Sequence, residues 1–142
     1  MEFHRGRLLD HVHLRAADLA ASRRFYRAVL QALGLDLTTE SERHFGADEL
    51  WVTARDEGPD DTRYVSRVHL AFQAVDREQV QRVHAAMLAA GGRDNGAPGE
   101  RHYHPGYYAA YALDPDGNNI EIVFHGPNQR SAASIVVTPA GP

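Results

Sequence analysis

Apolar and polar residues alternate near the start of the chain, and the pattern then changes to helical spacing. The strand predicted there carries Val12 and Leu14 on one face and His11 on the other. Asp18 is typical of a helix N-cap, and Gly34 is typical of the position after a helix end. The predicted elements of this half are a strand over 9–15, a helix over 19–33, and strands over 35–39 and 49–54.

The second half of the chain shows the same order of patterns. Val68 and Leu70 alternate with His69 in a predicted strand, and Asp76 is again typical of an N-cap. The predicted elements of this half are a strand over 67–73, a helix over 77–90, and strands over 107–113 and 119–124.

The strand–helix units of the two halves match without a gap. Residues of the first unit recur 58 positions later as the same residue type, among them His11, Asp18, Ala28, Leu30 and Gly34, which recur as His69, Asp76, Ala86, Leu88 and Gly92. We infer an internal duplication. It predicts an α+β fold in which two tandem βαβββ modules form a curved mixed sheet around a central cleft, with the helices outside.

The length of 142 residues fits a single domain over 1–142. Module one is predicted over about 8–57 and module two over about 66–125, with the polar loop 56–62 as the boundary. The tail from 126 onwards contains a short apolar stretch. An edge strand, a contact with a partner subunit and disorder are all open for it.

Composition excludes several classes of function. The net charge of −4 provides no basic surface for nucleic acid or an anionic membrane, and no apolar run approaches the roughly 20 residues of a membrane span. Cysteine is absent, which excludes disulfides, thiolate metal sites and a cysteine nucleophile. The first residues lack the apolar core of a signal peptide, so a cytoplasmic location is expected.

Three ionisable residues share one property. His11, His69 and Glu121 are each expected in mid-strand, on the face opposite the apolar residues of that strand. Two imidazoles and one carboxylate that converge on an open face are typical of a divalent metal site with free coordination positions, for Fe, Mn, Ni or Zn. Singly, each residue is also compatible with an ordinary polar strand position. His13 shares the His11 face and is a substitute ligand or a supporting donor.

The chain resembles the vicinal oxygen chelate superfamily. The resemblance rests on the segments 11–30, 68–72 and 114–121, the last of which reads Asp-Pro-Asp-Gly-Asn-Asn-Ile-Glu. That group includes glyoxalase I, extradiol dioxygenases, methylmalonyl-CoA epimerase, and the fosfomycin and bleomycin resistance proteins. The resemblance implies that His11, His69 and Glu121 are the metal ligands, that a small substrate is chelated through adjacent oxygens, and that the protein is a homodimer.

The chain departs from glyoxalase I at one position. When residues 50–52 are set on 120–122, Trp51 falls where glyoxalase I has a fourth ligand. Tryptophan cannot bind a metal ion and instead predicts an apolar wall for the substrate. A slip in register would bring Glu49 to this face, near the start of its strand.

Residues 92–108 are rich in glycine, proline, histidine and tyrosine, a composition that excludes a helix or a central strand. The segment is expected either to bind substrate or to be a long connection that packs its aromatic residues. The predicted substrate-binding residues are Trp51, Arg101, Tyr103 and Tyr107. The predicted acid–base residues are His13, His102 and His104.

These observations favour a metal-dependent, glyoxalase-like lyase or isomerase that acts on a small molecule. One alternative is an extradiol-type ring-cleaving dioxygenase, because three protein ligands suit that chemistry. The other is an antibiotic-binding protein without enzymatic activity. Metal content, and oxygen uptake with catechols, distinguish these hypotheses.

Overall fold

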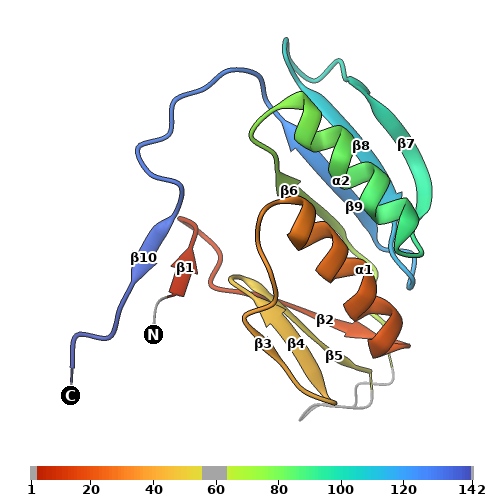
Figure 1. Ribbon diagram of the computed structural model, residues 1–142, viewed down its shortest axis with the longest axis vertical. Helices are drawn as coiled ribbons and strands as arrows, with labels where there is room; N and C mark the ends of the chain where they lie inside the picture. Colours follow the sequence, from red (N-terminus) through yellow and green to blue (C-terminus); the bar gives the residue numbers. More distant parts are fainter. Residues whose placement is uncertain (1–2, 56–63, 142) are drawn as a thin grey trace.

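The computed structural model describes residues 3–55 and 64–141, so the predicted boundary loop 56–62 lies outside the described residues. Module one consists of β2 (Val12–Ala16), α1 (Leu19–Ala32), β3 (Thr39–Glu40), β4 (His44–Ala47) and β5 (Leu50–Ala54). Module two consists of β6 (His69–Gln73), α2 (Arg77–Ala89), β7 (Arg93–Glu100), β8 (Tyr108–Leu113) and β9 (Asn119–Phe124). The predicted α+β fold of two βαβββ modules is confirmed (Figure 1).

Each module has its own four-stranded mixed sheet. The strand orders are β2-β5-β4-β3 and β6-β9-β8-β7, and in both sheets the first strand of the module pairs in parallel with the last. At the outer edge of β2, the backbone N–H of Ser66 donates to the Arg15 carbonyl at 3.0 Å. The strands of these two sheets pair only within their own module.

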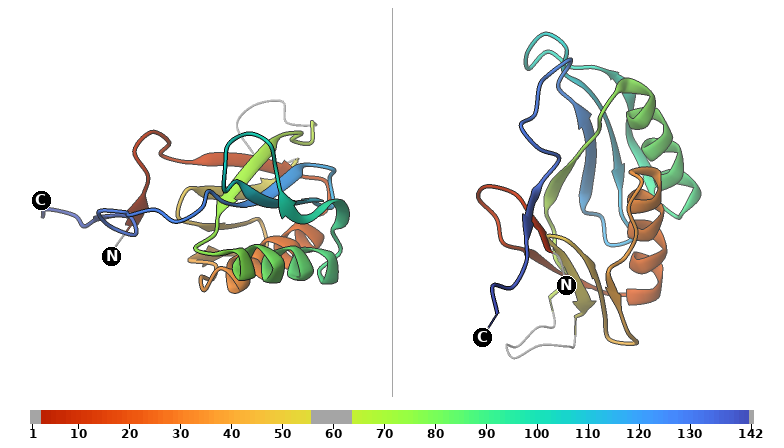
Figure 2. Two further views of the ribbon diagram at one scale, coloured as in Figure 1. Left: turned by 90° about the horizontal axis from the view of Figure 1, so that it is seen from above. Right: turned by 60° about the vertical axis from the view of Figure 1, so that its left-hand side comes forward.

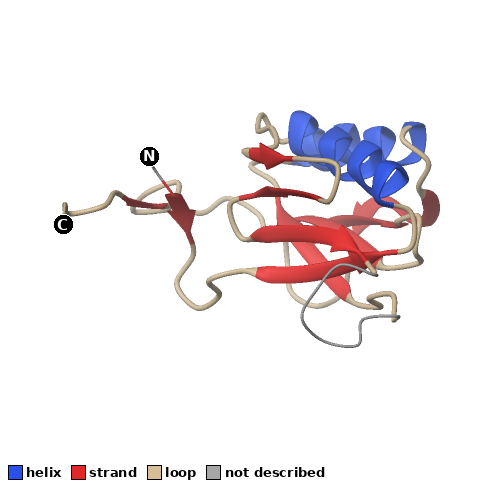
Figure 3. Cartoon of the chain, turned by 90° about the horizontal axis from the view of Figure 1, so that it is seen from below, coloured by secondary structure: helices blue, strands red, loops and turns tan. Residues whose placement is uncertain are grey.

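Both helices lie on one side of the two sheets, and they pack against each other (Figure 3). Their N-caps are the predicted ones, because the side chains of Asp18 and Asp76 accept hydrogen bonds from the backbone N–H of Ala21 and Gln79. The core between helices and sheets is apolar and includes the fully buried Phe25, Tyr26, Val29, Phe45, Val80, Val83, Met87, Ile120 and Ile122. In the described part of the chain, the opposite faces of both sheets are free of helices.

The predicted strand boundaries are wrong at several places. Residues 35–39 contain only the start of β3, and β4 is an additional strand. The segment with glycine and proline forms β7, an edge strand with register shifts near Gly96 and Gly99, which agrees with the exclusion of a central strand. These strands depend on pairing with distant residues, which local patterns do not report.

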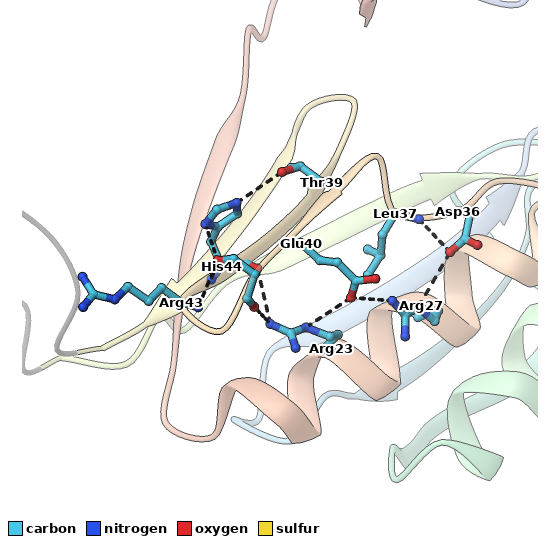
Figure 4. Close-up of polar contacts among 9 residues, drawn as sticks. Arg23, Arg27, Asp36, Leu37, Thr39, Glu40, Arg43 and His44 are labelled. Carbon is cyan, nitrogen blue, oxygen red and sulfur yellow. Dashed lines mark hydrogen bonds and ion pairs between the residues drawn. The ribbon is translucent and has the colours of Figure 1, made fainter.

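An ion-pair network holds the outer strands of module one to α1 (Figure 4). Arg27 donates to the carboxylate of Glu40 at 2.6 Å and lies 3.8 Å from Asp36. Arg23 donates to the backbone carbonyl of His44 at 3.3 Å. The two-residue strand β3 is therefore held by side chains of the helix as well as by its own ladder.

The two ends of the chain pair outside the modules. Strand β1 (Phe3–Arg5) pairs antiparallel with β10 (Ile135–Val137), and this ribbon extends away from the rest of the molecule (Figure 2). The apolar stretch of the tail thus forms a strand, one of the three possibilities left open by the sequence. None of the helices among the described residues is long and apolar enough to cross a membrane.

A buried turn of module two contacts α1 of module one. The Tyr26 hydroxyl donates to the Asp114 carboxylate at 2.6 Å, and both side chains are buried. Burial, followed by the charge and hydrogen bond of Asp114, raises the pKa of Tyr26 well above its usual value near 10.

This shift predicts a loss of stability at alkaline pH. The unfolded chain releases the phenol proton above about pH 10, whereas the folded protein keeps it. The contribution of Tyr26 is thus fully present below that pH and is lost as pH rises through the folded-state pKa. We expect the free energy of unfolding, measured with urea, to fall above about pH 10. In Tyr26→Phe the decline should be shallower, and equal slopes in both proteins would contradict the assignment.

Candidate functional site

Glu121 is the centre of a polar cluster on the helix-free face of module two. It lies in the middle of β9, its flanking isoleucines face the core, and its side chain is almost fully buried. Nε2 of His69 lies 2.9 Å from one carboxylate oxygen. The hydroxyls of Tyr107 and Tyr111 both donate to the other, Tyr111 at 3.2 Å. Three donors from three segments therefore meet on one carboxylate.

The strand register explains this convergence. Tyr111 of β8 and Ala71 of β6 are the two cross-strand neighbours of Glu121. Ala71 is small, so His69, two residues earlier on the same face, reaches the carboxylate past it. Tyr107 immediately precedes β8, and its hydroxyl reaches the carboxylate from the end of the sheet.

Both tyrosines act as neutral hydrogen-bond donors. Burial is the main cause that raises the pKa of Tyr107, and the hydrogen bond to Glu121 adds to it. Burial and the charge of Glu121 likewise raise the pKa of Tyr111. A carboxylate only accepts, so His69 donates through Nε2 and carries its proton there.

Module one provides a different surface on its helix-free face. A cavity of about 310 Å³ is lined by His11, His13, Asp48, Leu50 and Trp51. The Trp51 ring stacks on His44 at 4.5 Å, and hydrogen bonds from Thr39 and Ser41 hold the imidazole of His44 in place (Figure 4). The tryptophan wall is therefore rigid, which suits a surface against which a flat ligand packs.

His13 lies in the same cavity as Trp51. It forms a hydrogen bond with the Thr53 hydroxyl at 2.9 Å. Burial first, and then the charges of Arg15 and His11, lower the pKa of His13. His13 is accordingly held neutral beside the cavity.

The two modules are related in register but differ in chemistry. His13 pairs with Trp51 across β2 and β5, and Ala71 pairs with Glu121 across β6 and β9. Trp51 thus stands in module one where Glu121 stands in module two, in agreement with the alignment of residues 50–52 with 120–122. Module one supplies an apolar wall at the place where module two supplies a carboxylate.

His11 lies apart from the other two predicted ligands. Strand β2 begins at Val12 and β6 begins at His69, so the expectation that both histidines lie in mid-strand is wrong. Nδ1 of His11 is 2.6 Å from the carboxylate of Asp10, and the His11 side chain is 61% exposed. Within residues 3–55 and 64–141, no three His, Asp or Glu side chains lie close enough to hold a metal ion. In this described part of the chain, His11 is therefore not grouped with His69 and Glu121.

The predicted site residues of the loop between β7 and β8 make different contacts. The guanidinium of Arg101 donates to the carbonyls of Ala97 and Glu100 and lies over the Tyr111 ring at 5.4 Å, so it braces β7. The exposed ring of Tyr103 lies between those of His102 and Tyr107.

Four further residues belong to these surfaces and were not singled out from the sequence. They are Arg15, Tyr64, Tyr111 and His125. Arg15 is 5% exposed on the His13 face, and its Nε donates to the Tyr64 hydroxyl at 3.0 Å. Arg15 is two residues after His13 and so lies on the same face of its strand. Tyr111 is the cross-strand neighbour of Glu121. These two relations are the signals that could have identified them. No local signal joins Tyr64 or His125 to the site.

Comparison with known proteins identifies the family of the chain. The model of the Glyoxalase/Bleomycin resistance protein/Dioxygenase superfamily matches residues 8–122. The chain belongs to this superfamily. No protein of curated function matches it.

Solved structures with the superfamily fold cover most of the chain. A glyoxalase/bleomycin resistance protein from Albidiferax ferrireducens T118 is 30% identical, with a TM-score of 0.70 over 82% of this chain and 98% of that one. A glyoxalase-related enzyme from Fulvimarina pelagi is 21% identical, with a TM-score of 0.69 over 94% and 99%. Lactoylglutathione lyase from Agrobacterium tumefaciens is 21% identical, with a TM-score of 0.60 over 84% and 93%. The superfamily includes enzymes and binds small molecules, and the last two likenesses show the fold alone.

Proposed function

We propose that this superfamily member is a glyoxalase-like lyase or isomerase that moves a proton on a small carbonyl compound, with Glu121 as the acid–base group. The observation that carries the proposal is the Glu121 cluster. A carboxylate that is 3% exposed accepts from an imidazole and two phenols, all on the helix-free side of a rigid strand.

The chemistry of proton transfer suits this arrangement. A positioned carboxylate takes a proton from carbon next to a carbonyl, and nearby donors stabilise the oxyanion that forms. Tyr111 and His69 supply an O–H and an N–H beside the carboxylate, and the His69 side chain is 53% exposed, so a ligand can reach it. Mid-strand placement holds the carboxylate in one orientation, which acid–base catalysis requires.

Proton exchange with a panel of candidate substrates tests the proposal. The protein is incubated in D2O with small 2-oxo and 2-hydroxy compounds and their thiol adducts, and deuterium incorporation is followed by NMR. We expect incorporation at the carbon next to the carbonyl of at least one compound, faster than in buffer alone. Incorporation at the buffer rate for the whole panel would overturn the proposal.

Metal binding is the second part of the proposal. The divalent ion predicted from the sequence would find two donors in His69 and Glu121, and the third, His11, lies on the other module. A second copy of the chain that brought its His11 to this pair would complete the set. We therefore expect metal binding to depend on the homodimer.

Elemental analysis of size-separated fractions checks this expectation. The dimer should contain about one Fe, Mn, Ni or Zn ion per chain, and the monomer little. His11→Ala should dimerise without the ion, whereas His102→Ala, which alters the loop after β7, should keep it. Metal in the monomer, or in the His11→Ala dimer, would contradict a site shared between two chains.

A binding protein without turnover is the alternative that one observation favours, since no three His, Asp or Glu side chains within the described part of one chain are grouped to hold a metal ion. Trp51 is the single tryptophan and lines the cavity of module one, so its fluorescence reports a bound ligand. A change in fluorescence without proton exchange would favour this alternative. The extradiol dioxygenase hypothesis stays a prediction, which oxygen uptake with catechols tests.

A further inference from the structure

Two histidines that are 21 residues apart form a pair beside the Glu121 cluster. Nε2 of His104 lies 2.8 Å from Nδ1 of His125, and the two rings are inclined by only 17°, edge to edge, with centroids 5.1 Å apart. The Tyr107 ring meets both edge-on, with centroids 5.3 Å from His104 and 5.0 Å from His125. The hydroxyl of the same tyrosine donates to Glu121.

The hydrogen bonds of this pair define which nitrogen carries each proton. Nδ1 of His104 lies 2.9 Å from the carbonyl of Pro105, which only accepts, so this nitrogen is the donor. Nε2 of a neutral His104 is then an acceptor, and Nδ1 of His125 donates to it. The pair thus has one hydrogen-bonding arrangement in the neutral state.

The backbone brings the two histidines together. Gly106 and Gly126 have φ values of +87° and +92°, a region that side chains disfavour. A Cβ added to Gly106 would lie 3.4 Å from the Cα of Gly126, so the two backbones are in direct contact. This contact closes the loop before β8 onto the end of β9 and places His104 beside His125.

We propose that His104 and His125 are positioning residues that hold the Tyr107 hydroxyl on Glu121. Tyr107 precedes β8, and its backbone is held by hydrogen bonds with Arg101 and His104. Its ring contacts the loop and the residue after β9, and these contacts orient the hydroxyl. The inference rests on the proposed role of Glu121. It assigns His104 a function other than the acid–base role predicted from the sequence.

Crystal structures of variants at neutral pH test this inference without an activity assay. The readout is the distance between the Tyr107 hydroxyl and the nearer carboxylate oxygen of Glu121, which are hydrogen-bonded in the parent. The orientation of the Tyr107 ring is a second readout, since the ring meets both imidazoles edge-on.

Two variants of similar size separate the hydrogen bond from packing. Asparagine in His125→Asn retains a donor near the position of Nδ1, and leucine in His125→Leu does not. We expect the Tyr107 hydroxyl in His125→Leu to lie beyond hydrogen-bond distance of Glu121, more than about 3.5 Å away. In His125→Asn the hydroxyl should stay hydrogen-bonded to Glu121, as in the parent. A Tyr107–Glu121 hydrogen bond that persists in His125→Leu would overturn the inference.

A second pair covers the case in which His125→Leu does not fold. His104→Gln keeps an acceptor for His125, whereas His104→Met has similar length and lacks one. The same contrast in the Tyr107–Glu121 distance is expected, and its absence would again overturn the inference. A failed structural test leaves proton exchange by Glu121 intact, and a failed exchange assay leaves the Tyr107–Glu121 distance unchanged, so the two failures are distinguishable.

Discussion

Replacement of Asp114 with alanine is expected to lower the free energy of unfolding by about 2 to 5 kcal/mol. The Asp114 carboxylate is 5% exposed and accepts four hydrogen bonds. Its partners include the Tyr26 hydroxyl and the side-chain amide of Asn118, each 1% exposed. Removal of the acceptor leaves at least two buried donors unpaired, and each such donor costs about 1–3 kcal/mol.

Urea unfolding measures this effect, and Asp114→Asn is the matched control. Asparagine keeps the shape and one acceptor oxygen, so its loss of stability should be smaller than that of alanine. A double-mutant cycle with Tyr26→Phe should be non-additive, because both changes remove the same bond between the modules. A loss below about 1 kcal/mol in Asp114→Ala would contradict a structural role for this turn.

Replacement of Glu121 with glutamine is expected to reduce proton exchange by about 100-fold or more, because general acid–base groups contribute roughly 10²–10⁴ to rate. Glutamine retains the size of the side chain and one oxygen acceptor for the surrounding donors. The fold should therefore be preserved, which a far-ultraviolet circular dichroism spectrum and the urea midpoint check. Deuterium incorporation at the parent rate would exclude Glu121 as the acid–base group.

Glu49→Gln is the matched control for this experiment. Glu49 is the carboxylate that a slip in register would bring to the Trp51 position, and in the structure it precedes β5. Its backbone carbonyl accepts from Val12, and the register instead pairs Trp51 with His13. Proton exchange in Glu49→Gln should equal that of the parent.

Local patterns predicted the helices and the repeat correctly. Asp18 and Asp76 cap their helices as expected, since an N-cap depends on residues within one turn. The separate alignment of residues 50–52 with 120–122 placed Trp51 and Glu121 at equivalent positions, which the two parallel registers reproduce. Strands β3 and β4 were misjudged, and the extent of the edge strand β7 was not predicted, because these strands depend on partners elsewhere in the chain.

The candidate site was likewise predicted only in part from the sequence. The sequence alone determined the two-module fold, the superfamily and the singular position of Glu121, because a carboxylate between two core isoleucines is visible in the alternation of one strand. Tertiary structure alone decided that Tyr107, Tyr111 and His69 reach this carboxylate while His11 does not. It also joined His104 to His125 through a contact between two glycines. The reason is that side-chain convergence depends on the register between strands and on loop closure, which residues distant in the chain set together.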